Sequence, residues 1–546
     1  MHSWLVLLPP LIVIVLATIT RKISWSILAG IVAGLLILHD CSLPIVTQDL
    51  LMRLWRAAEI DKLCAGDFLS MSYLYICLFL LTLTIIITMI SYSGGAHAYG
   101  NFVMKYLKRP EQAEKASLLL SLCFCIDDYF SSLTTGSVMQ PVTDRFKIAR
   151  VKLALLVNGM AAPLVVIFPI SSWVAEIMMQ LRQSGVGPAT DPGTLVQTDL
   201  LPFYVSVIPF IFYAFLAIAA LWLLVLTRNS FGLLLKHEDV AAKTGNLFAG
   251  KMPLSRRLVD VDPDVIARAA LIDFILPIGM LFVTVFLGIL YFGGWEGFGG
   301  QHTFIFALQK SNVAAALFAG SCITLFVSVS FLLARMKLRL KQIPRIFGEG
   351  ISVMLPSVIT LVLIWTLSAM LKGDLGTGKY LATLLVGSVK LAYLPAVFFL
   401  ITALTATTMG SAWGAIGIYV ALAVPMLVSL SGVATPVTVA QLPLVLPLIG
   451  AIISGAVIGN HLSPISDTML MSSTSSGAYH SDLVRVQFWF AMPVIAASTI
   501  SFLVSAFMIS GGMGTGYAAL AGLLSGVMCL LAVLKALSYW SRRKRA

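Results

Sequence analysis

Adjacent carboxylates occur at Asp127 and Asp128, inside an otherwise apolar segment at residues 116–142. Carboxylate oxygens are the ligands that small hard cations prefer, and an acidic group at membrane depth can also carry a proton. Two neighbouring acids resist being ionised together, so one of them can stay protonated near neutral pH. The pair is therefore a candidate site that exchanges a cation for a proton. The alternative is structural, with Asp128 accepting backbone N–H groups as a helix N-cap.

A third carboxylate, Asp467, lies in a polar stretch at residues 459–468 that follows the apolar run 442–458. Pro464 removes a backbone donor and leaves carbonyl groups free, which favours a broken helix beside a wet cavity. Asp467 and these carbonyls predict a cation site, and the alternative is again a helix cap. His461 could relay protons or could donate a structural hydrogen bond. The neutral candidate ligands are Ser466, Asn460 and Asn158.

Small and aromatic residues recur in two matching triplets, Ser171-Ser172-Trp173 and Ser411-Ala412-Trp413. Small residues let backbones approach closely, and a buried Trp N–H needs a partner. The triplets are therefore expected to shape a substrate cavity rather than to bind an ion. The candidate cavity residues are Ser171, Ser172, Trp173, Thr408, Ser411, Trp413, His461 and Ser463. Glu176 lies near the outer end of its apolar run, so we expect its side chain to be solvated.

The composition indicates that membrane-spanning helices carry these residues. Of 546 residues, 59% are hydrophobic and 11% are charged, with a mean hydropathy of +0.96. Many apolar runs approach ~20 residues, the length of a helix that crosses a bilayer. The predicted fold class is an all-α polytopic membrane protein with about 11 transmembrane helices and two re-entrant hairpins in inverted repeats. The expected spans are 4–20, 23–39, 71–92, 151–180, 201–226, 269–292, 312–334, 346–371, 442–468, 486–509 and 517–537.

Lys and Arg in the short connecting segments predict the orientation. Basic segments such as 105–115, 335–345 and the tail 542–545 are expected on the cytoplasmic side, which places the N-terminus outside and the C-terminus inside. The net charge of +12 therefore reports topology and does not indicate nucleic acid. Both flanks of residues 116–144 are basic, which predicts a hairpin that enters and returns on the inner side. A second hairpin, at 392–427, is predicted to enter from the outer face, because this arrangement keeps Arg485 and the basic tail on the cytoplasmic side.

Short sequence matches divide the chain into two repeats. Thr134-Thr135-Gly136-Ser137 in the first hairpin matches Thr407-Thr408-Met409-Gly410-Ser411 in the second. Pro169-Ile170-Ser171-Ser172 likewise matches Pro464-Ile465-Ser466-Asp467. This order with opposite predicted orientation is typical of secondary transporters, whose site lies midway across the membrane at broken helices. The expected organisation is an N-terminal helix pair with an external loop at 1–70, a first repeat at 71–227, a cytoplasmic linker with two connecting helices at 228–345, a second repeat at 346–509, and a C-terminal helix with a basic tail at 510–546.

Other function classes are disfavoured by the motifs that the sequence lacks. It has no phosphate-binding loop, dinucleotide fingerprint or HExxH motif, which argues against an ATP-driven pump. Asp127-Asp128 and His461 could serve aspartyl proteolysis or metal-dependent hydrolysis, but the repeated hairpins favour a transporter that is not an enzyme. No cofactor is expected other than a sodium ion. Cys41 and Cys64 share one predicted external loop, and the sequence leaves their pairing open.

These motifs together resemble the NhaC-type sodium/proton antiporter family, within the larger group of ion transporters with paired re-entrant hairpins. The resemblance rests on Asp127-Asp128-Tyr129, Pro141-Val142-Thr143-Asp144, Ala161-Ala162-Pro163, Pro169-Ile170-Ser171-Ser172-Trp173, Leu375-Gly376-Thr377-Gly378, Gly410-Ser411-Ala412-Trp413-Gly414 and Gly459 to Thr468. It implies sodium-coupled transport across a bacterial cytoplasmic (inner) membrane. Family members often carry Asp where this chain has Asn460, and an Asp-Ser-Thr run where it has Asn158-Gly159-Met160. Both changes replace a carboxylate, a potential proton carrier, with an amide.

The leading hypothesis is a sodium/proton antiporter that works by alternating access, with sodium bound by Asp127, Asp128 and Asp467. The alternative is a sodium-coupled exchanger or symporter of an amino acid or a small carboxylate, which the amides at Asn460 and Asn158 make more credible. The expected partners are the lipid bilayer, sodium, and protons or a small organic substrate, with no nucleic acid. A homodimer is compatible with the sequence.

Overall fold

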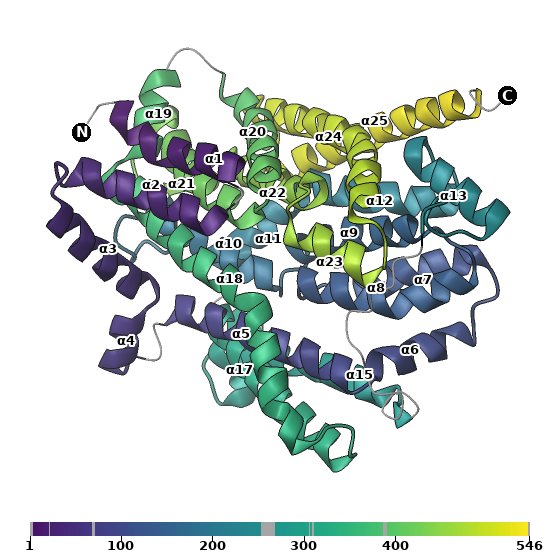
Figure 1. Ribbon diagram of the computed structural model, residues 1–546. Coiled ribbons are helices and arrows are strands. Elements are labelled where there is room, and N and C mark those ends of the chain that lie inside the picture. The colour runs from purple at the N-terminus through teal and green to yellow at the C-terminus, as the bar shows by residue number, and fades with distance from the viewer. Residues whose placement is uncertain are drawn as a thin grey trace.

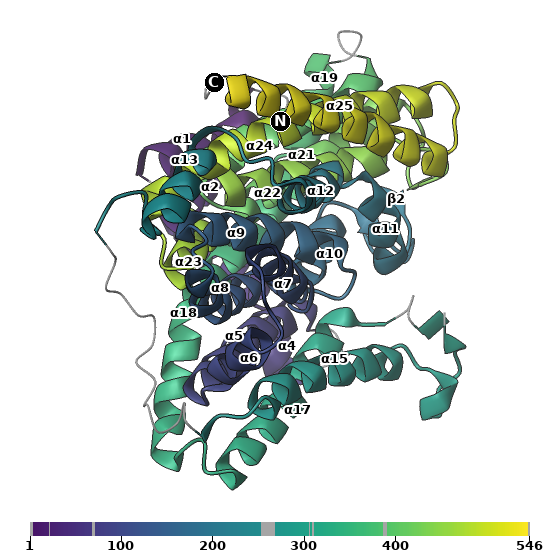
Figure 2. The ribbon, with the colours of Figure 1, turned by 90° about the vertical axis from the view of Figure 1, so that its right-hand side faces the viewer.

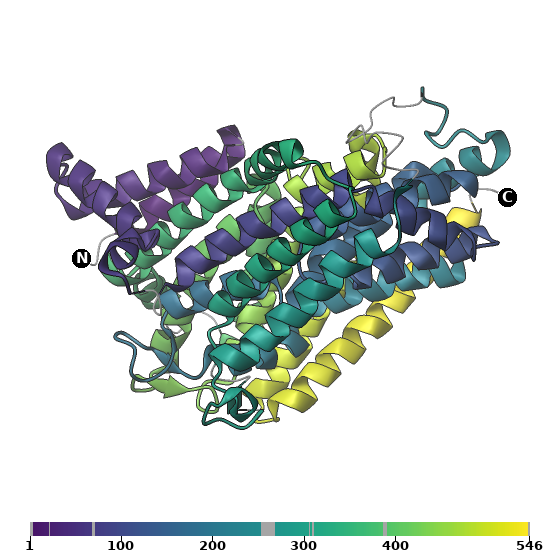
Figure 3. The same cartoon turned by 90° about the horizontal axis from the view of Figure 1, so that it is seen from below.

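The computed structural model describes residues 4–20, 22–67, 71–252, 268–304, 306–307, 311–385 and 390–543. In this part of the chain almost every element is a helix (Figure 1). Eleven of the described helices are long and apolar enough to cross a membrane. Figure 3 shows the long helices running in a common direction, as in a membrane bundle. The prediction of an all-α polytopic membrane protein is confirmed.

The helices that reach spanning length are not all the expected ones. The helices α1 (Leu8–Thr20) and α2 (Ile23–Leu38), both expected as spans, have 13 and 16 residues. They fall short of the ~20 residues that a full crossing needs. By contrast, α20 (Leu394–Met409) with the turn before it and α21 (Ala412–Ser431), expected as the two arms of one hairpin, each meet the length and hydropathy of a span.

The N-terminal helices form one edge of the molecule (Figure 1). After α1 and α2, which pack on each other, come α3 (Leu43–Ala57) and the short α4 (Ile60–Ala65). Both α2 and α3 contact α18 of the second half. Cys41 and Cys64, whose pairing the sequence leaves open, are free thiols with exposed side chains.

The first half of the bundle follows these helices and ends before a linker. Its helices are α5 (Ser72–Tyr92), α6 (Gly95–Met104), α7 (Pro110–Leu122), α8 (Asp128–Arg145), α9 (Arg150–Ile167), α10 (Ser172–Gln183), α11 (Leu200–Val207) and α12 (Phe212–Thr227). The linker region contains α13 (Gly232–Thr244), α15 (Ile272–Phe292) and α17 (Val313–Ala334). The helix α17 packs on α15 and α5, and this group lies at one edge in Figure 2.

The second half repeats the order of elements. Its helices are α18 (Ile343–Ala369), α19 (Thr377–Leu385), α20, α21, α22 (Val445–Leu462), α23 (Asp467–Ser475) and α24 (His480–Ser510), followed by α25 (Thr515–Arg543). The pair α7–α8 contacts α9, and the pair α20–α21 contacts α22. In Figures 1 and 2, α24 and α25 lie at the edge opposite α15 and α17.

Two long apolar segments are broken at the motifs that the sequence singles out. The first divides into α9 and α10 around residues 168–171, and the second into α22 and α23 around residues 463–466. Pro169 and Pro464 lie in these breaks. Proline has no backbone N–H to donate, so it interrupts a helix but is tolerated just before a new helix starts. The expected span 151–180 is therefore two helices.

A small parallel sheet ties two loops together. The strands β1 (Val186–Gly187) and β3 (Val437–Thr438) both pair with β2 (Val196–Gln197). One loop follows α10 and the other precedes α22. The first broken helix therefore ends on the side of the molecule where the second one begins.

Glycines at one face of α22 allow α20 to approach closely. Gly455 and Gly459 are one helical turn apart, the small-residue spacing that favours close helix packing in membranes. A Cβ atom added at Gly459 would lie 2.6 Å from Ala406 Cβ, and one added at Gly455 would lie 2.6 Å from the carbonyl oxygen of Phe399. These contacts fix the second broken helix against the hairpin helix α20.

Candidate functional site

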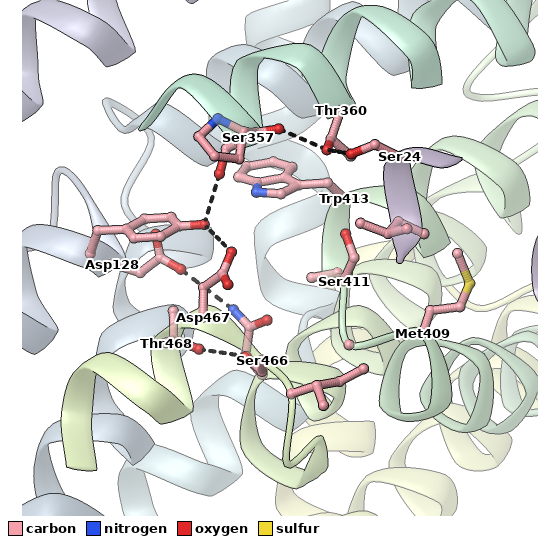
Figure 4. Close-up of a pocket in the computed structure, with 17 residues that line it drawn as sticks. Ser24, Asp128, Ser357, Thr360, Met409, Ser411, Trp413, Ser466, Asp467 and Thr468 are labelled. Atoms are coloured by element: carbon pink, nitrogen blue, oxygen red, sulfur yellow. Dashed lines mark hydrogen bonds between the residues drawn. The ribbon is translucent and has the colours of Figure 1, made fainter. Parts of the chain in front are cut away.

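A cavity of about 200 Å³ lies where the hairpins and the second broken helix meet (Figure 4). Its walls come from α2, α8, α18, the tip between α20 and α21, and the break between α22 and α23. Its polar lining includes Ser24, Asp128, Ser357, Ser411 and Asp467. No Lys or Arg is among its described lining residues, and its charged side chains are the carboxylates Asp128 and Asp467.

Asp128 is the first residue of α8, and its side chain is buried at 1% exposure. The amide Nδ2 of Asn460 donates to Asp128 Oδ2 at 3.4 Å. Asp128 Oδ1 has no hydrogen-bond partner among the described residues. A buried carboxylate oxygen without a donor is costly unless it binds a cation or a proton.

Asp467 is the first residue of α23 and is exposed, unlike Asp128. The Tyr129 hydroxyl donates to Asp467 Oδ2 at 3.1 Å and lies 3.2 Å from the Ser357 hydroxyl. In Figure 4 Asp467 and Asp128 lie on the same wall of the cavity. Tyr129 follows Asp128 in the chain, so this tyrosine links the two carboxylates.

Three helices begin at the cavity, namely α8, α21 and α23. The N-terminus of a helix carries a partial positive charge, which stabilises negatively charged groups placed there. Two of the helices have a carboxylate at their first position, Asp128 and Asp467. The third, α21, is capped by Ser411, whose hydroxyl accepts from the Gly414 N–H at 3.2 Å, and its first turn has no acid.

Asp127 has a different environment from Asp128. Its Oδ1 accepts the backbone N–H of Phe130 at 2.9 Å as the N-cap of α8, and its Oδ2 accepts the Ser172 hydroxyl at 3.0 Å. It is buried and does not line the cavity. The cap that the sequence offered as the alternative for Asp128 is therefore made by Asp127, which joins the hairpin tip to α10.

The two amides of the predicted site hold the broken helix in place. Asn158 Nδ2 donates to the backbone oxygen of Asn460 at 3.4 Å, and Asn158 Oδ1 accepts the Ser472 hydroxyl at 3.4 Å. Asn460 lines the cavity, whereas Asn158 lies behind it. Ser466 also lines the cavity, with its hydroxyl 3.0 Å from that of Thr468.

The predicted cavity residues divide into lining and supporting groups. Ser411 and Trp413 line the cavity, and the Trp413 ring packs 4.4 Å from the ring of the buried Trp173, centroid to centroid. Ser171 caps α10 and donates to the Val165 carbonyl at 2.7 Å. The remaining members do not line the cavity: Ser172 bonds Asp127, Thr408 bonds the Thr405 carbonyl, Ser463 accepts the Ile465 N–H, and His461 Nδ1 lies 2.9 Å from the Tyr213 hydroxyl.

Sequence reasoning misses the cavity residues of α2 and α18. Ser24, Ser357 and Thr360 give it hydroxyl groups, and Ser24 lies 2.8 Å from Thr360. Pro356, inside a spanning helix, is the one signal that could have marked this part of α18. The expectation that Glu176 is solvated is wrong, because its side chain is 1% exposed and packs between helices. The helix α10 continues to Gln183, so Glu176 lies at its middle.

The donor set fits a monovalent cation better than a tightly bound divalent one. Among the described residues, no group of three His, Cys, Asp or Glu side chains gathers around one point. The cavity offers two carboxylates, several hydroxyl groups and the amide of Asn460. Sodium binds to oxygen ligands of this kind, and it would do so here as cargo rather than as a resident metal.

A helical membrane protein with two carboxylates in a cavity at a broken helix and two helix-pair tips belongs to the transporters. The model of the Na+/H+ antiporter family matches residues 193–507, more than half of the chain. The chain therefore belongs to the Na+/H+ antiporter family, and the resemblance to NhaC-type antiporters is confirmed at this level.

Individual relatives add detail. An uncharacterized protein of Haemophilus influenzae is 28% identical over 531 residues, 97% of this chain and 95% of that protein. The malate-2H(+)/Na(+)-lactate antiporter of Bacillus subtilis is 30% identical over 197 residues, which cover 35% of this chain and 38% of that protein. The crystal structure of the Alcanivorax borkumensis YdaH transporter, described as having an unusual topology, aligns with a TM-score of 0.42 and 12% identity, covering 83% of this chain and 90% of that one.

Proposed function

We propose that this transporter is a sodium/proton antiporter in which Asp128 and Asp467 bind sodium and protons in alternation. One observation carries the proposal: two carboxylates from separate helix N-termini face one cavity that has no Lys or Arg among its described lining residues. Such a cavity attracts cations. The hydroxyl groups that line the cavity, among them those of Ser466 and Ser411, supply the neutral oxygens that complete a sodium site.

Competition for the same carboxylates couples the two ions. When sodium binds, Asp128 and Asp467 must both be ionised, so any proton held there leaves. When a proton binds, the charge that retains sodium falls and sodium is released. Alternating access then requires only that the cavity, holding either sodium or protons, opens to one side of the membrane at a time. Asp127 supports this site as a cap, and sodium is the only ion required besides protons.

The setting of the antiporter is part of the same proposal. The basic connecting segments support a bacterial cytoplasmic membrane with the N-terminus outside and the C-terminus inside. The lipid bilayer is then the only necessary partner besides the transported ions. The exchange breaks no covalent bond, so the protein is a transporter and not an enzyme.

Inverted membrane vesicles test the antiport directly. With an imposed pH gradient, sodium is expected to dequench a pH-sensitive dye, and Asp467→Asn is expected to reduce this response at least about tenfold, because one carboxylate leaves the site. Asp191→Asn removes a loop carboxylate that pairs with Arg182 and should leave the response unchanged. The proposal fails if the unmodified protein gives no response at any pH from about 6 to about 9.

A second candidate is a sodium-coupled exchanger of a small carboxylate. The observation in its favour is the N-terminus of α21, which faces the cavity with no acid in its first turn. Backbone N–H groups at such an end bind carboxylates, and sodium beside Asp128 would balance the charge. The Bacillus subtilis relative is named for malate and lactate exchange. Sodium-dependent uptake of radiolabelled lactate or malate into proteoliposomes, without sodium/proton exchange, would favour this candidate over the first.

A further inference from the structure

One face of α10 carries a stripe of buried polar side chains. Ser172, Glu176, Gln180 and Ser184 follow one another at four-residue intervals, so they lie on the same side of the helix. Each is at most 1% exposed. The stripe begins where Ser172 donates to Asp127 at 3.0 Å, and it ends at the loop 184–199 that contains β1 and β2.

Glu176 is the one ionisable residue of this stripe, and its partners are neutral. Gln180 Nε2 donates to Glu176 Oε1 at 2.8 Å. Trp365 Nε1 lies 3.1 Å from Oε1 and 3.0 Å from Oε2. A glutamine would accept the same hydrogen bonds without the cost of burying a charge. An ionisable group kept at this depth therefore indicates a function that needs ionisation.

Among the described residues, no Lys, Arg or His forms an ion pair with Glu176. From α5 the titratable side chains Tyr73 and Cys77 face it. From α18 come Trp365 and Ser368, whose hydroxyl lies 3.0 Å from both Gln180 Oε1 and the Gly417 carbonyl of α21. At the end of α10 itself, Arg182 pairs with Asp191 of the loop at 2.9 Å.

We propose that Glu176 is a second proton-binding site, through which protons pass between the cavity carboxylates and the side of the membrane that holds loop 184–199. The inference rests on the proposed sodium/proton antiport. Ser172 donates to Asp127, the chain neighbour of the cavity carboxylate Asp128, and one helical turn of ~5–6 Å separates Ser172 from Glu176, a gap that one bridging water spans. Trp365 and Gln180 are positioning residues that hold the carboxyl group in line with the stripe.

The proton balance along this route is simple. As sodium binds, the proton that leaves Asp128 is taken up by the Glu176 carboxylate, which becomes a neutral carboxylic acid. Glu176 returns to its carboxylate form when that proton leaves past Gln180 and Ser184. Sodium itself does not pass this way, because only one acid lies on the stripe. The two ions therefore share the cavity but not the route.

Infrared spectroscopy of the purified protein tests the site without depending on transport. Spectra recorded between about pH 5 and about pH 9 should contain the stretching band of a protonated buried carboxyl group. Glu176→Gln should remove one such band, and Glu176→Asp should shift it. Identical bands in the unmodified protein and in Glu176→Gln would overturn the proposal.

Transport by proteoliposomes tests the route. Exchange of radioactive sodium for unlabelled sodium needs no proton movement, so Glu176→Gln should retain it within about twofold while sodium-driven proton flux falls at least about tenfold. Glu349→Gln, which removes a carboxylate of α18 that bonds Arg345 and Tyr92, is the matched control and should retain both activities.

Each other outcome has one meaning. Equal loss of both activities in Glu176→Gln would overturn the proposal, because Glu176 would then serve the fold or the sodium site. Full retention of both would also overturn it. If the unmodified protein exchanges sodium but moves no protons, the proposed sodium/proton antiport is wrong. The infrared experiment would still test whether Glu176 binds a proton, because it does not depend on transport.

Discussion

At the scale of single residues, the adjacent aspartates perform different tasks. Asp127 uses both carboxylate oxygens to cap α8 and to accept the Ser172 hydroxyl, whereas Asp128 lines the cavity and leaves one oxygen without a partner among the described residues. The sequence identifies the two aspartates as a candidate site, but it does not show which of them caps the helix, because that depends on the residue at which α8 starts. Glu176 escapes detection for a similar reason, since burial by Trp365 of a distant helix is invisible in the sequence.

Substitution of each aspartate separates the two tasks. Asn is as good an N-cap as Asp, so Asp127→Asn should retain sodium-dependent stabilisation and lose at most about 1 kcal/mol of stability. Asp128→Asn should fold but lose the stabilisation that sodium gives, which is about 2.7 kcal/mol at a hundredfold excess over Kd. Thermal unfolding with and without sodium chloride measures both. Loss of the sodium effect in Asp127→Asn alone would contradict the division.

At the scale of elements, helix breaks and tips bring the site together. The breaks were predictable from Pro169 and Pro464, because proline beside small polar residues interrupts an apolar run. The contributions of α2 and α18 were not predictable, since Ser24 and Thr360 are ordinary hydroxyl residues of apolar helices until tertiary packing places them together. Close packing of α20 on α22 then fixes where the second break lies.

Enlarging Gly459 tests that packing. A Leu side chain there would collide with Ala406, so Gly459→Leu should destabilise the protein by about 1–3 kcal/mol and displace Asn460 from Asp128. Gly279→Ala, in α15, meets no atom within 4 Å and serves as the control. Thermal unfolding in detergent and the sodium response measure the two effects. An unchanged melting temperature in Gly459→Leu would show that the two helices are not held this closely.

At the scale of the whole molecule, the two halves repeat one order of elements around the cavity. The all-helical fold class and the family could be predicted from the sequence, because the length of apolar runs and the order of motifs can be read along the chain. Which segments reach spanning length could not be predicted from the sequence. Residues 392–427 were expected as one re-entrant hairpin, but each of its two helices reaches spanning length. The sheet that joins the loops at β1, β2 and β3 also depends on contacts between distant segments.

The exposed thiols of Cys41 and Cys64 allow the orientation to be tested. A membrane-impermeant maleimide should label them in intact cells, because the loop that contains them is expected outside. Labelling should fall in the variant Cys41→Ala/Cys64→Ala, and the other exposed cysteines, Cys123 and Cys322, are also replaced by Ala in the background used next. In that background Ala242→Cys, on the exposed surface of α13, should be labelled only in inverted vesicles. Labelling of Ala242→Cys in intact cells would reverse the proposed orientation.

The most direct test of the central claim is proton release on sodium binding. Purified protein in weakly buffered detergent solution is titrated with sodium chloride while a pH indicator reports protons. Competition for Asp128 and Asp467 predicts release of protons as sodium saturates the site, little release in Asp128→Asn and Asp467→Asn, and normal release in Asp127→Asn. Sodium binding without proton release, or unchanged release in both Asp128→Asn and Asp467→Asn, would contradict the claim that these carboxylates exchange the two ions.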